Sequence, residues 1–333
     1  MLGVHTRLTD EAEQTKIDRT LEMVRAMGAG WVVEYFPWAY HEPRPGRYEW
    51  DHVDQVIDQA ERLGLRVIAR IDMVPAWARP PESTPKLLPP EYVDEYVEFL
   101  RQFARRYAGR LDGLLVWNEP NLSFEWGFRP VSAENYVALL RQAYLAVKAE
   151  DPELRVVAAG LAPTLEESDQ ALSELIYLRQ LYAAGAAPYF DALAGHAYGW
   201  QSPADEPPNR TRINFRRLEL QRQIMVEAGD GAKPILVTEA GWNDHPRWTK
   251  AVRPSQRIEY TLQALELAAA QWPWAELVAL WAFRLPTVAH NYNDYYTLVS
   301  TSFEPKPIYE ALRARFADPA SQWRASAEVK SGP

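Results

Sequence analysis

Two glutamates stand at the ends of apolar, β-branched runs, which is a costly place for a charge. Glu119 follows the run 114–116 within the sequence Trp-Asn-Glu-Pro, and Glu239 follows the run 235–237 within Thr-Glu-Ala-Gly-Trp. An ionised carboxylate is expensive to take out of water unless a partner or a reaction uses it. Either glutamate alone could be salt-bridged at a strand end, but two in equivalent places indicate carboxylates that work as a pair.

A pair of carboxylates has a defined chemistry on glycosidic bonds. One carboxyl must be protonated so that it can assist the leaving oxygen, and the other must be ionised so that it can act at the anomeric carbon. Mutual repulsion and unequal hydrogen bonding separate the two protonation states in such pairs. Glu119 and Glu239 could do this work if the fold brings them together.

The segments around these glutamates alternate between strand and helix patterns. Continuous apolar runs indicate buried parallel strands, and apolar residues at helical spacing follow each run. The expected strands are 2–5, 31–36, 66–71, 114–116, 155–160, 190–198, 235–239 and 277–283. The expected helices cover about 17–27, 53–63, 90–107, 132–150, 170–184, 213–228, 255–270 and 307–316.

Unbroken alternation of eight such units predicts a parallel sheet with helices outside it. In a chain of 333 residues, a single-domain (β/α)8 TIM barrel fits better than an open sheet, and no Gly-rich dinucleotide motif follows a strand. We expect the barrel over residues 1–316 and a disordered tail or linker over 317–333. The C-terminal strand ends of a barrel form its active face, so Glu119 and Glu239, on the fourth and seventh strands, should face one another across the mouth.

The two glutamate motifs resemble the signatures of clan A, the large clan of retaining β-glycosidases that includes glycoside hydrolase families 5, 39 and 51. Within the clan, Trp-Asn-Glu-Pro-Asn at 117–121 is closest to family 39-like proteins. The resemblance covers residues 2–316 and implies that Glu119 is the acid/base and Glu239 the nucleophile. The chain has no room for the accessory β-sandwich of family 39 β-xylosidases, which favours an open groove.

The same resemblance implies roles for further residues. Asn118 matches the asparagine that binds the substrate 2-hydroxyl. His196 and Tyr198 match a sixth-strand His-x-Tyr motif whose tyrosine hydrogen-bonds the nucleophile. Trp281 matches the tryptophan that forms the floor of the −1 subsite, and Arg70 is a weaker match to a charge partner of the nucleophile.

Other residues at strand ends have two interpretations each. His5 and Glu34 end the first and second strands, where they could cap the barrel mouth or contact substrate. Asp72, just past the third strand, is explained as a loop cap. Sugar rings stack on aromatic faces, so the tryptophans at or beyond strand ends suit a glycan groove, with loop packing as the alternative: Trp38, Trp77, Trp126, Trp200, Trp242 and Trp281.

Composition excludes several other kinds of protein. The formal net charge of −9 without a long basic run argues against nucleic acid or an anionic membrane surface as partner. The chain has no Cys and no His-x-x-x-His spacing, so we expect neither a catalytic metal nor a cofactor.

The sequence also bears on location. No run approaches the roughly 18–20 apolar residues that span a bilayer, and no signal peptide is visible. We expect a secreted or extracytoplasmic protein whose leader is absent from this sequence, with a cytoplasmic protein as the alternative. Nothing indicates the oligomeric state.

Three functions remain open at this stage. The first is a retaining glycoside hydrolase that acts within a β-linked polysaccharide, such as a bacterial exopolysaccharide. The second is a glycan-binding barrel without catalysis. The third is a transglycosylase that uses the same residues. The sugar and linkage depend on loops that the sequence pattern does not place.

Overall fold

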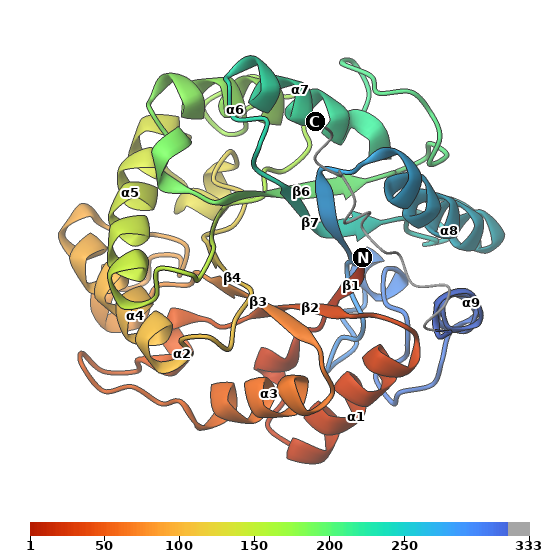
Figure 1. The fold of residues 1–333 in the computed structure, drawn as a ribbon, viewed down its shortest axis with the longest axis horizontal. Coiled ribbons are helices and arrows are strands. Elements are labelled where there is room, and N and C mark those ends of the chain that lie inside the picture. The colour runs from red at the N-terminus through yellow and green to blue at the C-terminus, as the bar shows by residue number, and fades with distance from the viewer. Residues whose placement is uncertain (319–333) are drawn as a thin grey trace, which may run out of the picture.

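The computed structural model describes residues 1–318 and forms a closed barrel of eight parallel strands. The strands follow chain order around the barrel, and β8 pairs with β1 to close it. Helices surround the strands as an outer ring (Figure 1). The predicted (β/α)8 fold is confirmed, whereas the tail predicted for 317–333 falls almost entirely outside the described residues.

The strands are β1 Leu2–His5, β2 Trp31–Tyr35, β3 Arg66–Ile71, β4 Gly113–Val116, β5 Val156–Ala158, β6 Ala192–Tyr198, β7 Ile235–Gly241 and β8 Ala275–Leu280. The helices are α1 Gln14–Ala26, α2 Trp38–His41, α3 Asp51–Arg62, α4 Val93–Arg106, α5 Ala133–Glu150, α6 Glu174–Ala183, α7 Leu218–Glu227, α8 Pro254–Gln271 and α9 Pro307–Phe316. Short 3-10 helices cover Leu8–Asp10, Ala76–Ala78, Pro90–Tyr92, Ser123–Trp126, Ala187–Tyr189, Phe215–Arg217 and Tyr292–Tyr295.

Some element bounds differ from those expected. Strand β8 ends at Leu280, so Trp281 lies just beyond the strand, and the peptide bond between Trp281 and Ala282 is cis. The segment after β2, expected to be a loop, begins with the helical turn α2, which Pro37 precedes as N-cap. Within residues 1–318, no helix has both the length and the apolar character to cross a membrane.

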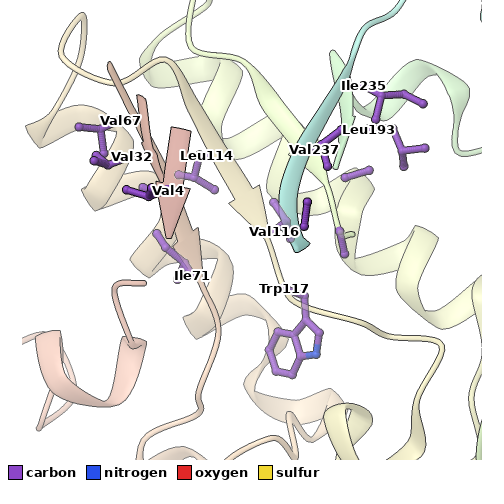
Figure 2. Packing of buried hydrophobic residues seen from close by; sticks show 14 of the residues in the cluster. Val4, Val32, Val67, Ile71, Leu114, Val116, Trp117, Leu193, Ile235 and Val237 are labelled. Atoms are coloured by element: carbon purple, nitrogen blue, oxygen red, sulfur yellow. The ribbon is translucent and has the colours of Figure 1, made fainter. Parts of the chain in front are cut away.

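Strand residues alternate between two apolar layers. One set packs against the helices and includes Val32, Val67 and Leu114 (Figure 2). The other set fills the barrel interior and includes Ile68. Because side chains alternate along a strand, Arg70 shares the inner face of β3 with Ile68. The register of β3 therefore directs a guanidinium into the barrel mouth.

Candidate active site

Both glutamates lie at the C-terminal mouth of the barrel. Glu239 is two residues from the end of β7, and Glu119 is on the turn that follows β4. Trp117 and Glu119 in this turn have positive φ angles of 72° and 41°, a conformation that costs a non-glycine residue about 1–2 kcal/mol. The Glu119 amide donates to the Gly160 carbonyl at 3.0 Å, which anchors the turn to the segment after β5.

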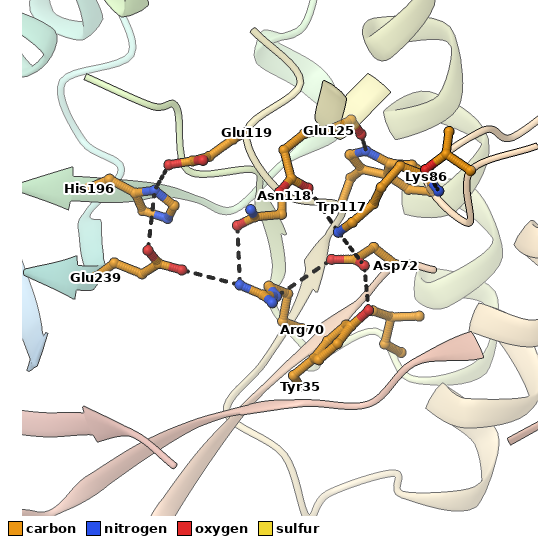
Figure 3. A network of polar contacts seen from close by, with 12 residues as sticks. Tyr35, Arg70, Asp72, Lys86, Trp117, Asn118, Glu119, Glu125, His196 and Glu239 are labelled. Carbon is orange, nitrogen blue, oxygen red and sulfur yellow. Dashed lines mark hydrogen bonds and ion pairs between the residues drawn. The ribbon is translucent and has the colours of Figure 1, made fainter. Parts of the chain in front are cut away.

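The structure brings the two carboxylates together around one histidine. A carboxylate oxygen of Glu119, one of Glu239 and a ring nitrogen of His196 all lie within 4.8 Å of one another. His196 Nδ1 is 2.8 Å from Oε1 of Glu119 and 3.8 Å from Oε2 of Glu239 (Figure 3). A Cβ atom at Gly160 would overlap the His196 ring, so this approach requires a glycine there.

Two donors hold the Glu239 carboxylate. The Tyr198 hydroxyl donates to Oε2 at 2.6 Å, and Arg70 Nη1 donates to Oε1 at 3.1 Å. The same Arg70 nitrogen donates to Oδ1 of Asn118 at 3.2 Å. Charge-assisted hydrogen bonds of this kind stabilise a negative carboxylate and fix its direction.

The surroundings also set the protonation of the neighbouring groups. Burial alone would lower the pKa of His196, but the negative charges of Glu239 and Glu119 outweigh burial and raise this pKa above 6.5. Burial, together with the charge of Glu239, raises the pKa of Tyr198 well above 10. The Tyr198 hydroxyl therefore keeps its proton and remains a donor to Glu239.

A fully buried carboxylate stands behind Arg70. Asp72 accepts from the Tyr35 hydroxyl at 2.7 Å and from Lys86 Nζ at 2.8 Å, and its Oδ2 lies 3.5 Å from Arg70 Nε. Burial alone would raise the pKa of Asp72, but the charges of Lys86 and Arg70 outweigh burial and lower it below 3.8. Asp72 thus orients Arg70, a larger role than the loop cap expected from sequence.

The chain of charges continues from Asp72 to a third glutamate at the site. Lys86 Nζ lies 2.8 Å from Oε2 of Glu125 as well as 2.8 Å from Asp72 (Figure 3). Burial raises the pKa of Glu125 from its ordinary 4.5, and the Lys86 ammonium opposes this shift. Lys86 and Glu125 were not predicted from sequence as site residues. They lie in long connecting segments without periodicity, and a single charged residue there does not indicate a site.

The paired glutamates open into a cleft of about 390 Å³. On the side of β6, β7 and β8 its lining includes six aromatic residues: Tyr198, Trp200, Trp248, Trp281, Tyr292 and Tyr296. Trp248 stacks on Tyr292 with ring centroids 4.8 Å apart, and Tyr296 meets the edge of Trp281 at 5.4 Å. Of these residues, Tyr198, Trp200 and Trp281 were named from sequence, whereas Trp248, Tyr292 and Tyr296 lie in segments after β7 and β8 that the sequence pattern did not place.

The structure does not bring Trp38 and Trp242 into the cleft. Trp38 is fully buried, where its ring packs on Trp77 and its Nε1 donates to Glu42 at 2.6 Å. Trp242 is also buried, and its Nε1 donates to the Ser202 carbonyl at 2.8 Å. The expectation of substrate contact therefore gives way to loop packing for both, because long loops need apolar cores of their own.

Two more expected tryptophans are engaged in packing. Trp77 packs edge-on against buried Trp38, and its Nε1 donates to the Glu42 carbonyl at 2.8 Å. Trp126 is buried and packs edge-on against Trp117. Neither lines the cleft around Glu119.

Glu34 has a structural position. It is fully buried and accepts hydrogen bonds from the Thr6 hydroxyl and from the amides of Leu8, at 2.9 Å, and Thr9, at 3.1 Å. Because Glu34 shares the outward face of β2 with Val32, it holds the loop after β1 and does not reach the cleft. This position favours a role for Glu34 as a cap at the barrel mouth over a contact with substrate.

His5 lies on the inner face of β1 and is fully buried. Burial and the positive charge of Arg70 lower the pKa of His5 well below 6.5, so its ring is neutral. The ring does not line the cleft. His5 therefore packs inside the barrel mouth, and direct substrate contact is not supported by its position.

Glu119, His196 and Glu239 are also the group among residues 1–318 whose ligand atoms are close enough to share a metal ion. The Arg70 guanidinium already donates to Glu239 at 3.1 Å. A fixed positive charge at that distance disfavours a second cation on the same carboxylate. The arrangement suits proton transfer and nucleophilic attack by two carboxylates better than metal binding.

Comparison with known sequences gives partial matches. Residues 9–108 match the family model of glycoside hydrolase family 42, described as beta-galactosidase. A stretch of 56 residues is 45% identical to mouse beta-galactosidase, and it covers 16% of this chain and 8% of that protein. The family match ends before Glu119 and Glu239, so it does not include the glutamate pair.

Comparison with solved structures covers nearly the whole chain. A family 39 glycoside hydrolase from Bacteroides cellulosilyticus WH2 matches with a TM-score of 0.74 at 19% identity over 94% of this chain and 62% of that one. A family 39 enzyme from Xanthomonas axonopodis pv. citri matches with a TM-score of 0.68 at 16% identity over 94% and 65%. A family 5, subfamily 18 protein from Bifidobacterium longum subsp. longum, solved with Manβ1-4GlcNAc, matches with a TM-score of 0.70 at 14% identity over 96% and 78%.

These structural likenesses show the fold. The chain spans less than two thirds of the length of both family 39 proteins. The neighbours are glycoside hydrolases of families 39 and 5, which are two of the families that the glutamate motifs resemble. The chain is therefore similar in fold to glycoside hydrolases of these two families over 94–96% of its length.

Proposed function

We propose that this protein is a retaining β-glycosidase in which Glu239 is the nucleophile and Glu119 the acid/base. The observation that carries the proposal is the separation of the two carboxylates. One oxygen of Glu119 and one oxygen of Glu239 lie within 4.8 Å of each other at the barrel mouth. Retaining glycosidases hold their carboxyl groups about 5–5.5 Å apart, whereas inverting enzymes need about 6.5–9.5 Å to admit a water.

In the first step, Glu239 attacks the anomeric carbon while Glu119 gives its proton to the departing glycosidic oxygen. In the second step, Glu119 removes a proton from water, and the resulting attack on the same carbon releases the sugar from Glu239. Tyr198 and Arg70 hold Glu239 so that one carboxylate oxygen meets the substrate. Asn118, whose Oδ1 accepts a hydrogen bond from Arg70, binds the sugar 2-hydroxyl in this proposal.

The aromatic lining of the cleft favours a substrate that extends over several sugar rings. Its aromatic lining comes from three segments, with Trp200 after β6, Trp248 after β7 and Trp281 after β8. Aromatic rings at successive positions can stack on successive sugar rings. We therefore propose endo action on a β-linked polysaccharide, with a bacterial exopolysaccharide as one substrate class.

The test is a cleavage screen over aryl β-glycosides, β-glucans, xylans, mannans, galactans and bacterial exopolysaccharides. We expect turnover, with a ladder of oligosaccharides from a polymer. Release of monosaccharide alone would refute endo action, and transfer products at high substrate concentration would indicate transglycosylation. Glycan binding without any cleavage over long incubation would contradict the enzymatic proposal.

A further inference from the structure

Glu125 presents a third carboxylate to the cleft that holds the catalytic pair. It belongs to the 3-10 helix Ser123–Trp126, on the turn that follows Glu119, and it lines the same cleft as Glu119 and Glu239. Its side chain is only 15% exposed. A carboxylate in such a place costs free energy unless partners satisfy its oxygens.

The position of Glu125 is fixed from two sides. Its Oε2 lies 2.8 Å from Lys86 Nζ, and its backbone carbonyl accepts a hydrogen bond from Trp117 Nε1 at 2.8 Å. Lys86 is in turn anchored at 2.8 Å to Asp72, which orients the Arg70 guanidinium. Glu125 therefore ends a rigid chain of alternating charges whose other end is the nucleophile Glu239 (Figure 3).

The Glu125 carboxylate lines the cleft and keeps capacity to accept hydrogen bonds. Its Oε2 pairs with Lys86 Nζ at 2.8 Å but has no hydrogen-bond partner among residues 1–318. An ionised carboxylate can only accept hydrogen bonds. A hydroxyl is the donor that a sugar offers, and a second carboxylate in its place would be repelled.

We infer that Glu125 is a specificity-determining residue that accepts a hydrogen bond from a hydroxyl of a neutral sugar bound beside Glu119. This inference rests on the proposed function and names the substrate class of the same site: neutral glycosides rather than uronides. Lys86 acts as a positioning residue that holds the Glu125 carboxylate at the wall of the cleft. The aromatic residues opposite would stack on the face of the sugar ring, and Glu125 would accept a hydrogen bond from a hydroxyl at the edge of that ring.

The test compares Glu125→Gln with the wild type on an aryl β-glycoside that the wild type cleaves and on its monodeoxy analogues. We expect kcat/KM on the parent glycoside to fall about 10- to 100-fold, as for a lost hydrogen bond to a charged group. One deoxy analogue should show almost no further loss, because it lacks the hydroxyl that Glu125 binds. Discrimination against the matching uronide should also relax. Glu91→Gln, at an exposed glutamate, serves as the control.

Two outcomes would overturn the inference: unchanged kcat/KM in Glu125→Gln, or an equal loss on the parent and on every deoxy analogue, which indicates a structural role. Calorimetric binding of neutral oligosaccharides to both proteins needs no turnover. Absent turnover with binding that Glu125→Gln weakens would contradict the hydrolase proposal alone. Turnover that Glu125→Gln leaves intact would contradict this inference alone. Absence of both binding and turnover in the wild type would refute both proposals.

Discussion

On the β3–β4 side of the cleft, charges alternate from buried Arg70 and Asp72 to partly buried Lys86 and Glu125, whereas the β6–β8 side presents partly buried rings such as Trp248. We call these the polar wall and the aromatic wall. A sugar ring has hydroxyls around its edge and C–H groups on its faces. The two walls match these two kinds of surface.

The walls also differ in what holds them in place. The polar wall is centred on the buried pair of Arg70 and Asp72, where loss of one partner leaves an uncompensated charge and costs about 3–5 kcal/mol. The aromatic wall consists of ring contacts worth about 0.5–1.5 kcal/mol each beyond area burial. If the proposed function holds, we expect catalysis to depend on the polar wall and the aromatic wall to contribute graded affinity.

The largest effect should follow a change at Glu239, the proposed nucleophile. Glu239→Gln keeps the size of the side chain but cannot form the covalent intermediate, so kcat should fall roughly 10⁴-fold or more. Circular dichroism should show a native fold, and Glu153→Gln at an exposed position should retain full activity. Near-native turnover by Glu239→Gln would refute its role.

Glu119→Ala should show an effect that depends on the leaving group. Substrates whose leaving group needs a proton should lose about 10²–10⁴-fold in kcat/KM. Aryl glycosides with acidic phenols should lose far less in the first step, because they leave without a proton. An equal loss on both kinds of substrate would contradict the acid/base role.

Within the polar wall, Asp72→Asn should destabilise the protein more than it alters any binding contact. Asp72 is fully buried between Lys86 and Arg70, so its neutralisation should lower the free energy of unfolding by about 3–5 kcal/mol. Urea denaturation gives this value. A change below about 1 kcal/mol would show that the chain of charges is not a structural unit.

Within the aromatic wall, Trp248→Ala should act on binding alone. Loss of its ring contact should raise KM for oligosaccharides about 2- to 10-fold and leave kcat nearly unchanged. The exposed Phe128→Ala variant on the opposite loop is the control. A large fall in kcat for Trp248→Ala would contradict the expectation that the aromatic wall contributes to affinity and not to catalysis.

The smallest expected effect is a pH dependence that arises where the walls meet, at His196. Its pKa is raised above 6.5 in the folded protein by Glu239 and Glu119 against the effect of burial. Its contribution to stability is therefore fully present below pH 6.5 and is lost as pH rises through the raised pKa. The difference in unfolding free energy between wild type and His196→Gln should shrink as the pH is raised above 6.5. A difference that grows over this range would contradict the assignment.

Periodicity predicted the barrel and the strand ends that carry Glu119 and Glu239, because apolar runs and turns are local properties of the chain. It failed for Trp38, which occupies the core of a loop, since an aromatic residue after a strand fits packing and stacking equally. Asp72, Lys86 and Glu125 form one unit through contacts between two loops. Such contacts depend on tertiary geometry, so no local sequence pattern predicts them.

The most direct test of the account is the stereochemistry of the first product. An aryl β-glycoside that the protein cleaves should be followed by proton NMR before the released sugar mutarotates. Double displacement through Glu239 predicts that the β-anomer appears first. Initial release of the α-anomer would mean a single displacement by water and would contradict the roles proposed for Glu119 and Glu239.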